Sequence, residues 1–333
     1  MSVLVIAEIG VNHNGDIRLA KEMIDAACEA GADVVKFQTY IAEEVMTDKT
    51  PLAAYMGDGD NNFLDLARRL ELSIEETVEL KKYTEERGAE FMSSPFDVPS
   101  TLALAKLGLK RLKIPSGETV NPFVMKAAAE TGLPLIVSTG MCTLKEVENS
   151  LEFLKKYKSG PVTLLHCTTQ YPAAFENVNL KAMQTLAEKF GVQTGYSDHT
   201  PGIEASLAAV ALGATVIEKH FTTDRSLPGP DQEASLIPDE LKTLVDCIRN
   251  ISKSLGDGRK EPKAVELEIA KVARKSLVAR YDLRAGDVIS WENVTAKRPG
   301  TGIPAWEFMK YEGRTLSKDL KADDLLSIED ICE

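Results

Sequence analysis

The feature that most constrains the fold is a unit that recurs from residue 1 to about residue 255: an apolar run, a polar turn and an amphipathic helix. Strands that are apolar on both faces and alternate with helices indicate a parallel sheet. Eight units in roughly 250 residues predict an α/β fold of the (β/α)8 TIM-barrel type, with an open doubly wound sheet as the alternative. The predicted strands are 3–9, 34–38, 90–94, 111–115, 133–138, 162–166, 193–197 and 216–220.

The segments between these strands contain the predicted helices, which include 19–30, 74–87, 144–157 and 203–212. Ser73 and Glu76 have the spacing of a capping box and mark the start of the second of these helices. The segment 41–72 is longer than an ordinary connection in such a fold. We therefore expect it to form a lid or a wall of a substrate site.

The pattern changes after Leu255, where glycines and charged residues replace the alternation of strands and helices. We predict a catalytic barrel domain at 1–255, a linker at 256–273 and a small, mostly β domain at 274–333. About 60 residues bury little core of their own. The small domain should therefore need support from the barrel or from a second subunit.

Charge and cysteine content narrow the partners of this chain of 333 residues. Its net charge of −12 makes nucleic acid and anionic membranes poor partners, so an anionic substrate would need a local cationic pocket. No secretory signal or long apolar stretch is apparent, so we expect no membrane span and a cytoplasmic protein. Five cysteines without a paired spacing fit reduced thiols in that compartment: Cys28, Cys142, Cys167, Cys247 and Cys332.

All four histidines of the chain fall at the C-terminal end of a predicted strand: His13, His166, His199 and His220. A single histidine is more often structural, but four at this end of a barrel indicate function, because active sites of such barrels lie there. His199 and His220 follow neighbouring strands. Neutral imidazoles suit a divalent metal with open positions for water and substrate. A hydrogen-bonded pair is the alternative.

Two lysines should point into the barrel near the same end. Lys36 and Lys113 lie in the second and fourth predicted strands, where a buried ammonium requires an anion. Glu8, Glu118 or a ligand would supply it. Glu8 is also the candidate general acid or base, with a salt bridge to Lys36 as the plainer role. Hydroxyl side chains that suit oxyanion binding end several strands: Ser94, Ser116, Ser138, Thr169 and Ser197.

Several motifs together resemble the sialic acid synthase family, which includes the N-acetylneuraminate and legionaminate synthases. The tail KRPG at 297–300 is similar to the antifreeze-like (SAF, β-clip) domain of that family, and the likeness spans nearly the whole chain. Two stretches, NLKAM at 179–183 and SLAAVALGA at 206–214, look nearer the legionaminate branch. The other matching phrases are AEIGVNHNG at 7–15, VKFQT at 35–39, SPFD at 94–97, KIPSGE at 113–118, STGM at 138–141, HCT at 166–168 with YP at 171–172, YSDHT at 196–200, EKHFT at 218–222 and GPD at 229–231.

The resemblance implies a reaction in which C3 of phosphoenolpyruvate joins the aldehyde carbon of an open-chain sugar. Water adds at C2, and phosphate leaves with C–O cleavage. The acceptor would be N-acetylmannosamine or a 2,4-diacetamido-2,4,6-trideoxymannose. Rival predictions are a metal-dependent pyruvate aldolase on the same barrel, which would release no phosphate, and a carbohydrate-binding C-terminal module on a barrel scaffold.

The resemblance also implies roles for individual residues. His199 and His220 would hold a divalent metal, manganese first, with magnesium or cobalt as alternatives. Arg298 would reach the N-acyl group from the other subunit, which implies a homodimer with exchanged C-terminal domains. The expected catalytic residues are Glu8, Lys36 and Lys113. Phosphoenolpyruvate would be bound by Lys36, Ser94, Lys113, Ser116, Ser138, Thr169 and Ser197. The sugar would be contacted by Gln38, Tyr171, Glu218, Asp231 and Arg298.

Overall fold

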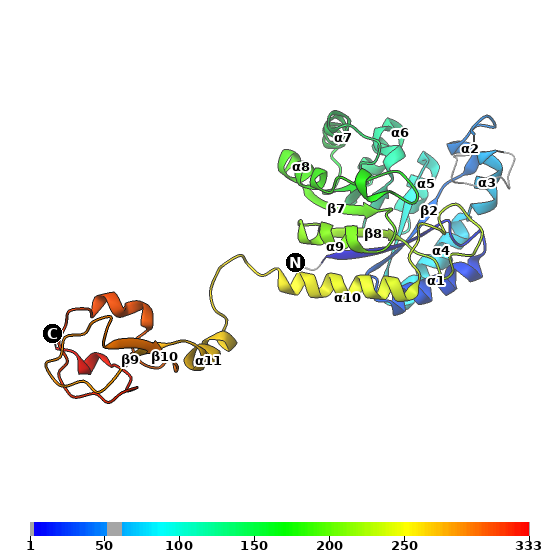
Figure 1. Cartoon of the computed structure of the whole chain (residues 1–333). Coiled ribbons are helices and arrows are strands. Elements are labelled where there is room, and N and C mark those ends of the chain that lie inside the picture. The colour runs from blue at the N-terminus through cyan, green and yellow to red at the C-terminus, as the bar shows by residue number, and fades with distance from the viewer. Residues whose placement is uncertain (1–2, 52–61, 333) are drawn as a thin grey trace. The chain divides into compact units, whose positions relative to one another are not determined.

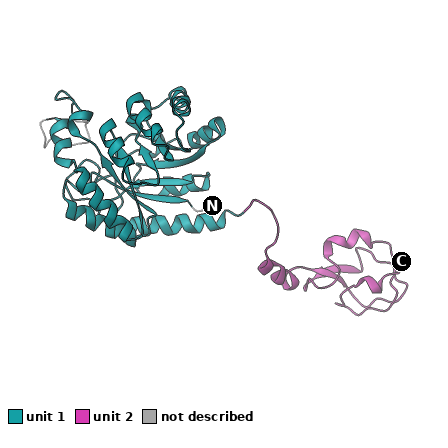
Figure 2. Ribbon diagram, turned by 180° about the vertical axis from the view of Figure 1, so that it is seen from behind, with its two compact units in different colours: residues 1–256 teal, residues 257–333 magenta. Residues whose placement is uncertain are grey.

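A computed structural model describes residues 3–51 and 62–332, and these fall into two compact units. The first spans residues 1–256 and the second spans residues 257–333 (Figure 2). Part of the predicted lid or wall at 41–72 lies outside the described residues. Within the described part of the chain, no helix is both long and apolar enough to cross a membrane.

The first unit is the predicted barrel. Its strands are parallel and run in the order β3-β2-β1-β8-β7-β6-β5-β4, with β3 and β4 in contact, so that the barrel is nearly closed. Because the first strand pairs with the last, the doubly wound alternative is wrong. The strands are β1 Leu4–Gly10, β2 Val34–Thr39, β3 Glu90–Pro95, β4 Leu112–Ile114, β5 Leu135–Ser138, β6 Val162–Cys167, β7 Gln193–Asp198 and β8 Val216–His220.

Helices surround these strands (Figure 1). Most of them contribute buried apolar residues to the main core cluster, whereas those of α2 and α3 form a separate cluster. In α1, for example, Ala20, Met23, Ile24 and Ala27 are buried at helical spacing. The capping box predicted at Ser73 is present at the start of α4. The helices of the unit are α1 Ile17–Glu29, α2 Ala42–Val45, α3 Phe63–Leu70, α4 Ile74–Glu86, α5 Val98–Ala105, α6 Pro122–Glu130, α7 Leu144–Lys156, α8 Lys181–Phe190, α9 Glu204–Ala211 and α10 Pro238–Ser254, with short 3-10 turns η1 Ser116–Val120 and η2 Phe175–Asn177.

Two layers of side chains fill the inside of the barrel. The lower one, here called the apolar layer, is a single buried cluster of Ile6, Val34, Met92, Ile136, Leu165 and Val216. Two residues further along each strand, alternation directs the next side chain inward again. That second set, here called the polar layer, is buried too and consists of Glu8, Lys36, Ser94, Lys113, Ser138, Cys167, Ser197 and Glu218.

The second unit begins with α11 Ala264–Ala273, which lies within the predicted linker. It continues with the antiparallel pair β9 Ser276–Ala279 and β10 Val294–Lys297, isolated β-bridges, and the turns η3 Ala305–Lys310 and η4 Ile328–Asp330. Its core is small and apolar, built around Leu277, Ile289, Phe308 and Leu326. The small antiparallel sheet agrees with the β structure predicted for this part of the chain.

Candidate active site

The centre of the candidate site is an ion-paired network in the polar layer. Lys36 extends from β2, and its Nζ lies 2.8 Å from Oε2 of Glu8 on β1. The same Nζ donates a hydrogen bond to Ser94 Oγ at 3.0 Å and lies 3.6 Å from Oε2 of Glu218. Neighbouring strands therefore bring the first two predicted catalytic residues into direct contact.

The second lysine joins the same network through Glu218. Nζ of Lys113 lies 3.2 Å from Oε1 of Glu218, which also accepts a hydrogen bond of 2.9 Å from Ser197 Oγ. Gln38 donates to Oε1 of Glu8 at 3.3 Å. The carboxylate of Glu118 instead accepts a hydrogen bond from Asn121. Glu218, which resemblance places near the sugar, is thus the anion shared by both lysines.

Burial and mutual attraction set the protonation of these groups. Burial raises the pKa of Glu8 to about 7, although Lys36 opposes the shift, and the nearby Glu218 adds to it. Burial also acts against ionisation of Glu218, but Lys113 and Lys36 together outweigh it and lower the pKa of Glu218 to about 2. One carboxyl therefore titrates near neutral pH while the other stays ionised.

The lysines respond differently to the same environment. Burial lowers the pKa of Lys113, with the attraction of Glu218 opposing that shift. For Lys36, burial acts in the same direction, but two carboxylates, Glu218 and Glu8, outweigh it and raise the pKa. Lys36 therefore remains an ammonium whose charge is held in place by three side-chain oxygens.

The four histidines lie at the predicted end of the barrel, but they divide into two kinds. His13 is buried, and its Nδ1 accepts a hydrogen bond from the backbone N–H of Gly15 at 3.0 Å. His166 lies 2.6 Å from the carbonyl oxygen of Val178 through Nε2. Each therefore has one ring nitrogen bonded to the local backbone, while Nε2 of His13 is buried without a partner. The backbone contacts fit the structural role that is usual for a single histidine.

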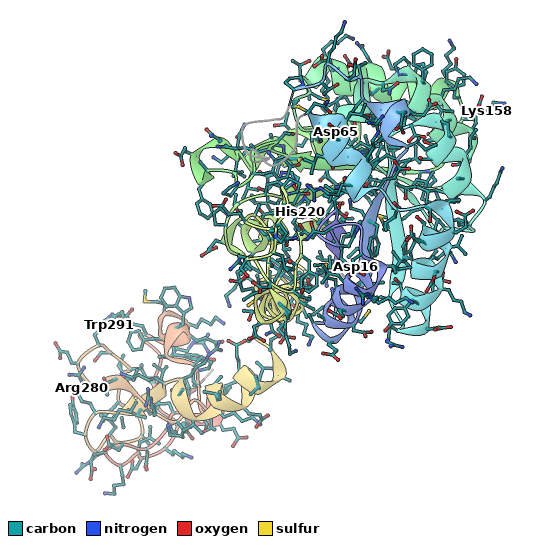
Figure 3. All side chains as sticks on the ribbon, turned by 90° about the vertical axis from the view of Figure 1, so that its right-hand side faces the viewer. Asp16, Asp65, Lys158, His220, Arg280 and Trp291 are labelled. Atoms are coloured by element: carbon teal, nitrogen blue, oxygen red, sulfur yellow. The ribbon has the colours of Figure 1, made fainter. Side chains whose placement is uncertain are left out.

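His199 and His220 are brought together at the ends of β7 and β8. Their ring centroids are 5.5 Å apart, and Figure 3 shows His220 inside the first unit. Nδ1 of His199 lies 2.7 Å from the carbonyl oxygen of Thr168. Donation to that carbonyl would leave Nε2 of His199 with a free lone pair. Burial lowers the pKa of His220 well below its usual value, so His220 is neutral near pH 7.

The chemistry of this pair fits a divalent ion with an incomplete protein ligand set. Nδ1 of His220 is buried without a hydrogen-bond partner and lies 3.8 Å from Oδ2 of Asp231. Among residues 3–51 and 62–332, no group of three or more His, Cys, Asp or Glu side chains is arranged to hold a metal. Two imidazoles would therefore leave the remaining positions to water and substrate oxygens.

The predicted hydroxyl groups lie beside the lysines on the same rim. Ser116 Oγ accepts a hydrogen bond of 3.0 Å from the backbone N–H of Gly140. A Cβ atom at Gly140 would lie only 2.3 Å from Oγ1 of Thr169 and 2.7 Å from Oγ of Ser116, so glycine is required there. Ser138 ends β5 with its Oγ buried and without a partner. The hydroxyl hydrogens of Ser116 and Ser138 therefore remain available to an oxyanion.

The predicted sugar-contacting residues separate into two groups. Gln38, Tyr171 and Asp231 line one cavity with His220. The Tyr171 ring lies 4.1 Å from that of His199, centroid to centroid. Burial raises the pKa of Asp231 to about 6. Arg298 belongs to the second unit, where its Nε donates to the carbonyl of Ala273, and its predicted role across a subunit interface stays a prediction.

Two features of the site were not foreseen from the sequence. Sγ of Cys167 lies 3.8 Å from Nδ1 of His199, and alternation from Leu165 would have placed it inside the barrel. Behind the histidines, Nζ of Lys219 lies 3.0 Å from Oδ2 of Asp198, and both side chains are fully buried. Each member of this pair directly precedes a candidate metal ligand in the sequence, which is the signal that could have revealed it.

Comparison with known proteins identifies the family of this chain. Residues 23–260 match the NeuB family, and residues 274–331 match the SAF domain. The chain belongs to the NeuB family. The N,N'-diacetyllegionaminic acid synthase of Campylobacter jejuni is 47% identical over 328 residues, covering 97% of this chain and 98% of that protein. A protein of the same description from Legionella pneumophila is 46% identical, covering 99% and 95%.

Solved structures of relatives agree with this NeuB assignment. An N-acetylneuraminic acid synthetase from Leptospira borgpetersenii superposes with a TM-score of 0.73 at 41% identity, over 81% of this chain and 90% of that one. The predicted family, the barrel with its SAF domain and the synthase class are therefore confirmed for this NeuB chain.

Proposed function

We propose that the chain condenses phosphoenolpyruvate with 2,4-diacetamido-2,4,6-trideoxymannose and water, with release of phosphate by C–O cleavage. The relatives from Campylobacter and Legionella, both described as N,N'-diacetyllegionaminic acid synthases, support this acceptor over N-acetylmannosamine. The observation that carries the proposal is the polar layer, in which two buried lysines lie under a pair of histidines at the mouth of the barrel.

Phosphoenolpyruvate would bind over the two lysines. The ammonium groups of Lys36 and Lys113 can neutralise the charge of its carboxylate and phosphate, in a chain whose net charge is otherwise −12. Oxygen atoms of the substrate would also accept hydrogen bonds from the surrounding hydroxyl groups. The donors proposed for this are Ser94, Ser116, Ser138, Thr169 and Ser197.

Glu8 would move protons in the reaction. Its carboxyl has a pKa of about 7 and lies in contact with Lys36. A group that titrates near neutral can deliver the proton that the aldehyde oxygen gains and accept the proton that the adding water loses. Glu218, held ionised by both lysines, would keep their ammonium groups in position rather than transfer protons.

His199 and His220 would hold a divalent metal ion, which we propose to be manganese, with magnesium or cobalt as alternatives. When bound, such an ion supplies Lewis acidity to the aldehyde of the sugar. Gln38, Tyr171 and Asp231, which line the adjoining cavity, would orient the acceptor. Arg298 would complete the sugar site from a second subunit, in a homodimer with exchanged C-terminal domains.

Phosphate release is the direct test. The purified protein would receive phosphoenolpyruvate and Mn²⁺ with each acceptor in turn, with and without EDTA. We expect release that depends on the sugar, falls on chelation and is faster with the trideoxy sugar. Phosphoenolpyruvate labelled with ¹⁸O at the bridging oxygen should pass its label to phosphate, because the C–O bond breaks. Release of unlabelled phosphate, or none from folded, metal-loaded protein, would contradict the proposal.

A further inference from the structure

A cavity of about 200 Å³ lies beside His220, and its lining combines two kinds of side chain. Four lining residues have polar side chains: Gln38, Tyr171, His220 and Asp231. Six apolar lining residues from the segments around α2, α3 and the end of β3 form what is here called the apolar wall: Val45, Met46, Phe63, Leu66, Leu70 and Phe96. Pockets for whole ligands measure roughly 300–1,000 Å³, so this cavity suits one end of a sugar.

The apolar wall is built before any ligand arrives. Its residues come from α2 and the residue after it, from α3 and from the turn after β3. Leu66 and Leu70 belong to one buried cluster, and the other four are partly buried and pack against it. Polar contacts anchor this cluster from outside: the backbone N–H of Ile41 donates to Asp97 at 2.9 Å, and that of Ala42 donates to Glu71 at 2.9 Å. Tyr40 donates through its hydroxyl to the carbonyl of Ala67. A wall held in this way presents a fixed apolar surface.

We infer that the apolar wall selects the acceptor by its C6 substituent, accepting a methyl group and rejecting a hydroxymethyl group. This inference rests on the proposed function, which places the aldehyde at the histidines and so directs the opposite end of the open-chain sugar away from them. His220 and Asp231 line the same cavity as the apolar wall. The C6 end of an acceptor lying along the cavity would meet that wall.

The size of the expected discrimination follows from the chemistry of the wall. The six side chains of the wall carry no strong hydrogen-bonding group, so a C6 hydroxyl packed against them would lose its water without replacement. An apolar pocket discriminates against an added hydroxyl by only about 100-fold, because the group still fits. A preference of roughly 10- to 100-fold in kcat/KM for the 6-deoxy acceptor is therefore expected.

Two sugar pairs that differ only at C6 test the inference. The first is 2,4-diacetamido-2,4,6-trideoxymannose against its 6-hydroxy counterpart, and the second is N-acetyl-6-deoxymannosamine against N-acetylmannosamine. The variant combines Val45→Thr with Met46→Gln, two half-buried positions where these changes add polarity at similar size. Val192→Thr, beside the opposite end of the barrel at the start of β7, is the matched control.

The wild type should prefer the 6-deoxy member of each pair, and the double variant should reduce that preference about tenfold. The change should appear in KM of the 6-deoxy sugar with kcat nearly constant, because a contact made equally in ground and transition states is lost. The control should keep the wild-type ratio. Thermal unfolding of all three proteins would show that they are equally folded.

The possible results distinguish the inference about the apolar wall from the proposed synthase function. Equal kcat/KM for both members of a pair in the wild type, or an unchanged preference in the double variant, would overturn the inference and leave the synthase proposal intact. Absence of sugar-dependent phosphate release with all four sugars would overturn the proposed function and this inference with it.

Discussion

The two layers inside the barrel lie two residues apart on the same strands, yet their chemistry is opposite. The apolar layer is a closed cluster that includes Ile6, Met92 and Val216, and its burial stabilises the fold at about 25 cal/mol per Å². The polar layer buries two lysines and two glutamates, whose removal from water is costly even when they are paired. The polar layer is therefore retained for chemistry, and the apolar layer is retained for stability.

The apolar layer also influences the pKa values of the side chains in the polar layer. It closes the barrel beneath Glu8 and Lys36, so their charges face a medium of low polarity on that side. Burial is the largest influence on the pKa of Glu8, which rises to about 7 despite a lysine at 2.8 Å. An apolar floor under a charged layer is thus one physical route to a carboxyl that titrates near neutral pH.

The contrast between the two layers can be tested by removing charges from the polar layer. The double variant Lys36→Met with Glu8→Gln removes one ammonium and its partner together, so no charge loses its closest counterion. We expect kcat/KM to fall by at least about 10³-fold, since substrate neutralisation and proton transfer are both lost. The free energy of unfolding should change little, because removing both charges of a buried pair removes the cost of their burial together with their attraction.

Steady-state kinetics and calorimetric unfolding of the barrel would check this pair of expectations. Lys36→Met alone serves as the control, because it leaves Glu8 and Glu218 with one fewer counterion and should lower stability. A double variant that is markedly less stable than Lys36→Met would contradict the view that the charges of the polar layer do not stabilise the fold.

The reverse test removes a side chain from the apolar layer and leaves the polar layer unchanged. Met92→Ala removes a fully buried side chain from the apolar layer, two residues before Ser94. The lost burial and the remaining cavity should lower the free energy of unfolding by about 2–5 kcal/mol. The kcat/KM of the folded protein should change only a few-fold. A loss of activity as large as that of the Lys36 variant, at a temperature where Met92→Ala is folded, would show that the layers are not separable.

A third prediction concerns the pair behind the histidines. Asp198 accepts hydrogen bonds from the N–H and the hydroxyl of Thr200 and from Ser206, and it pairs with Lys219. These contacts tie the ends of β7 and β8 together beside His199 and His220. Asp198→Asn should therefore weaken Mn²⁺ binding by about 10- to 100-fold, the usual effect of disturbing groups that orient metal ligands.

Titration calorimetry with Mn²⁺ alone measures the affinity for Mn²⁺ without an activity assay. Asp33→Asn is the matched control, because Asp33 also holds a salt bridge, to Arg249, but at the opposite end of the barrel. It should reduce stability and leave the Mn²⁺ dissociation constant unchanged. Equal losses of Mn²⁺ affinity in both variants would assign the effect of Asp198 to general destabilisation.

The layers also mark what sequence can and cannot predict here. Alternation within a strand identifies Glu8, Lys36 and Lys113 as inward-facing, since that rule depends on neighbours in the chain. The partner of Lys113 is Glu218, about a hundred residues away, and only the register of the closed barrel brings them together. His13 and His166 show the same limit, because their backbone partners are supplied by turns that no periodicity describes.

The smallest expected effect comes from the charge of the polar layer itself. Below pH 7 Glu8 is largely protonated, so Lys36, Lys113 and the ionised Glu218 sum to one positive charge. Above pH 7 Glu8 ionises and the sum falls to zero. Sulfate, whose own charge is constant in this range, should therefore bind roughly tenfold more weakly at pH 8 than at pH 6, a difference of about 1.4 kcal/mol.

Glu8→Gln keeps the shape of the side chain and removes its ionisation. Its sulfate affinity should therefore change less between pH 6 and pH 8 than that of the wild type, with Asp231 and His199 as the remaining titrating groups at the site. Sulfate dissociation constants for both proteins between pH 6 and pH 8 would decide the point. If the variant kept the full pH dependence, the titrating group would be another residue, and the apolar floor would not be the reason that the polar layer changes charge near neutral pH.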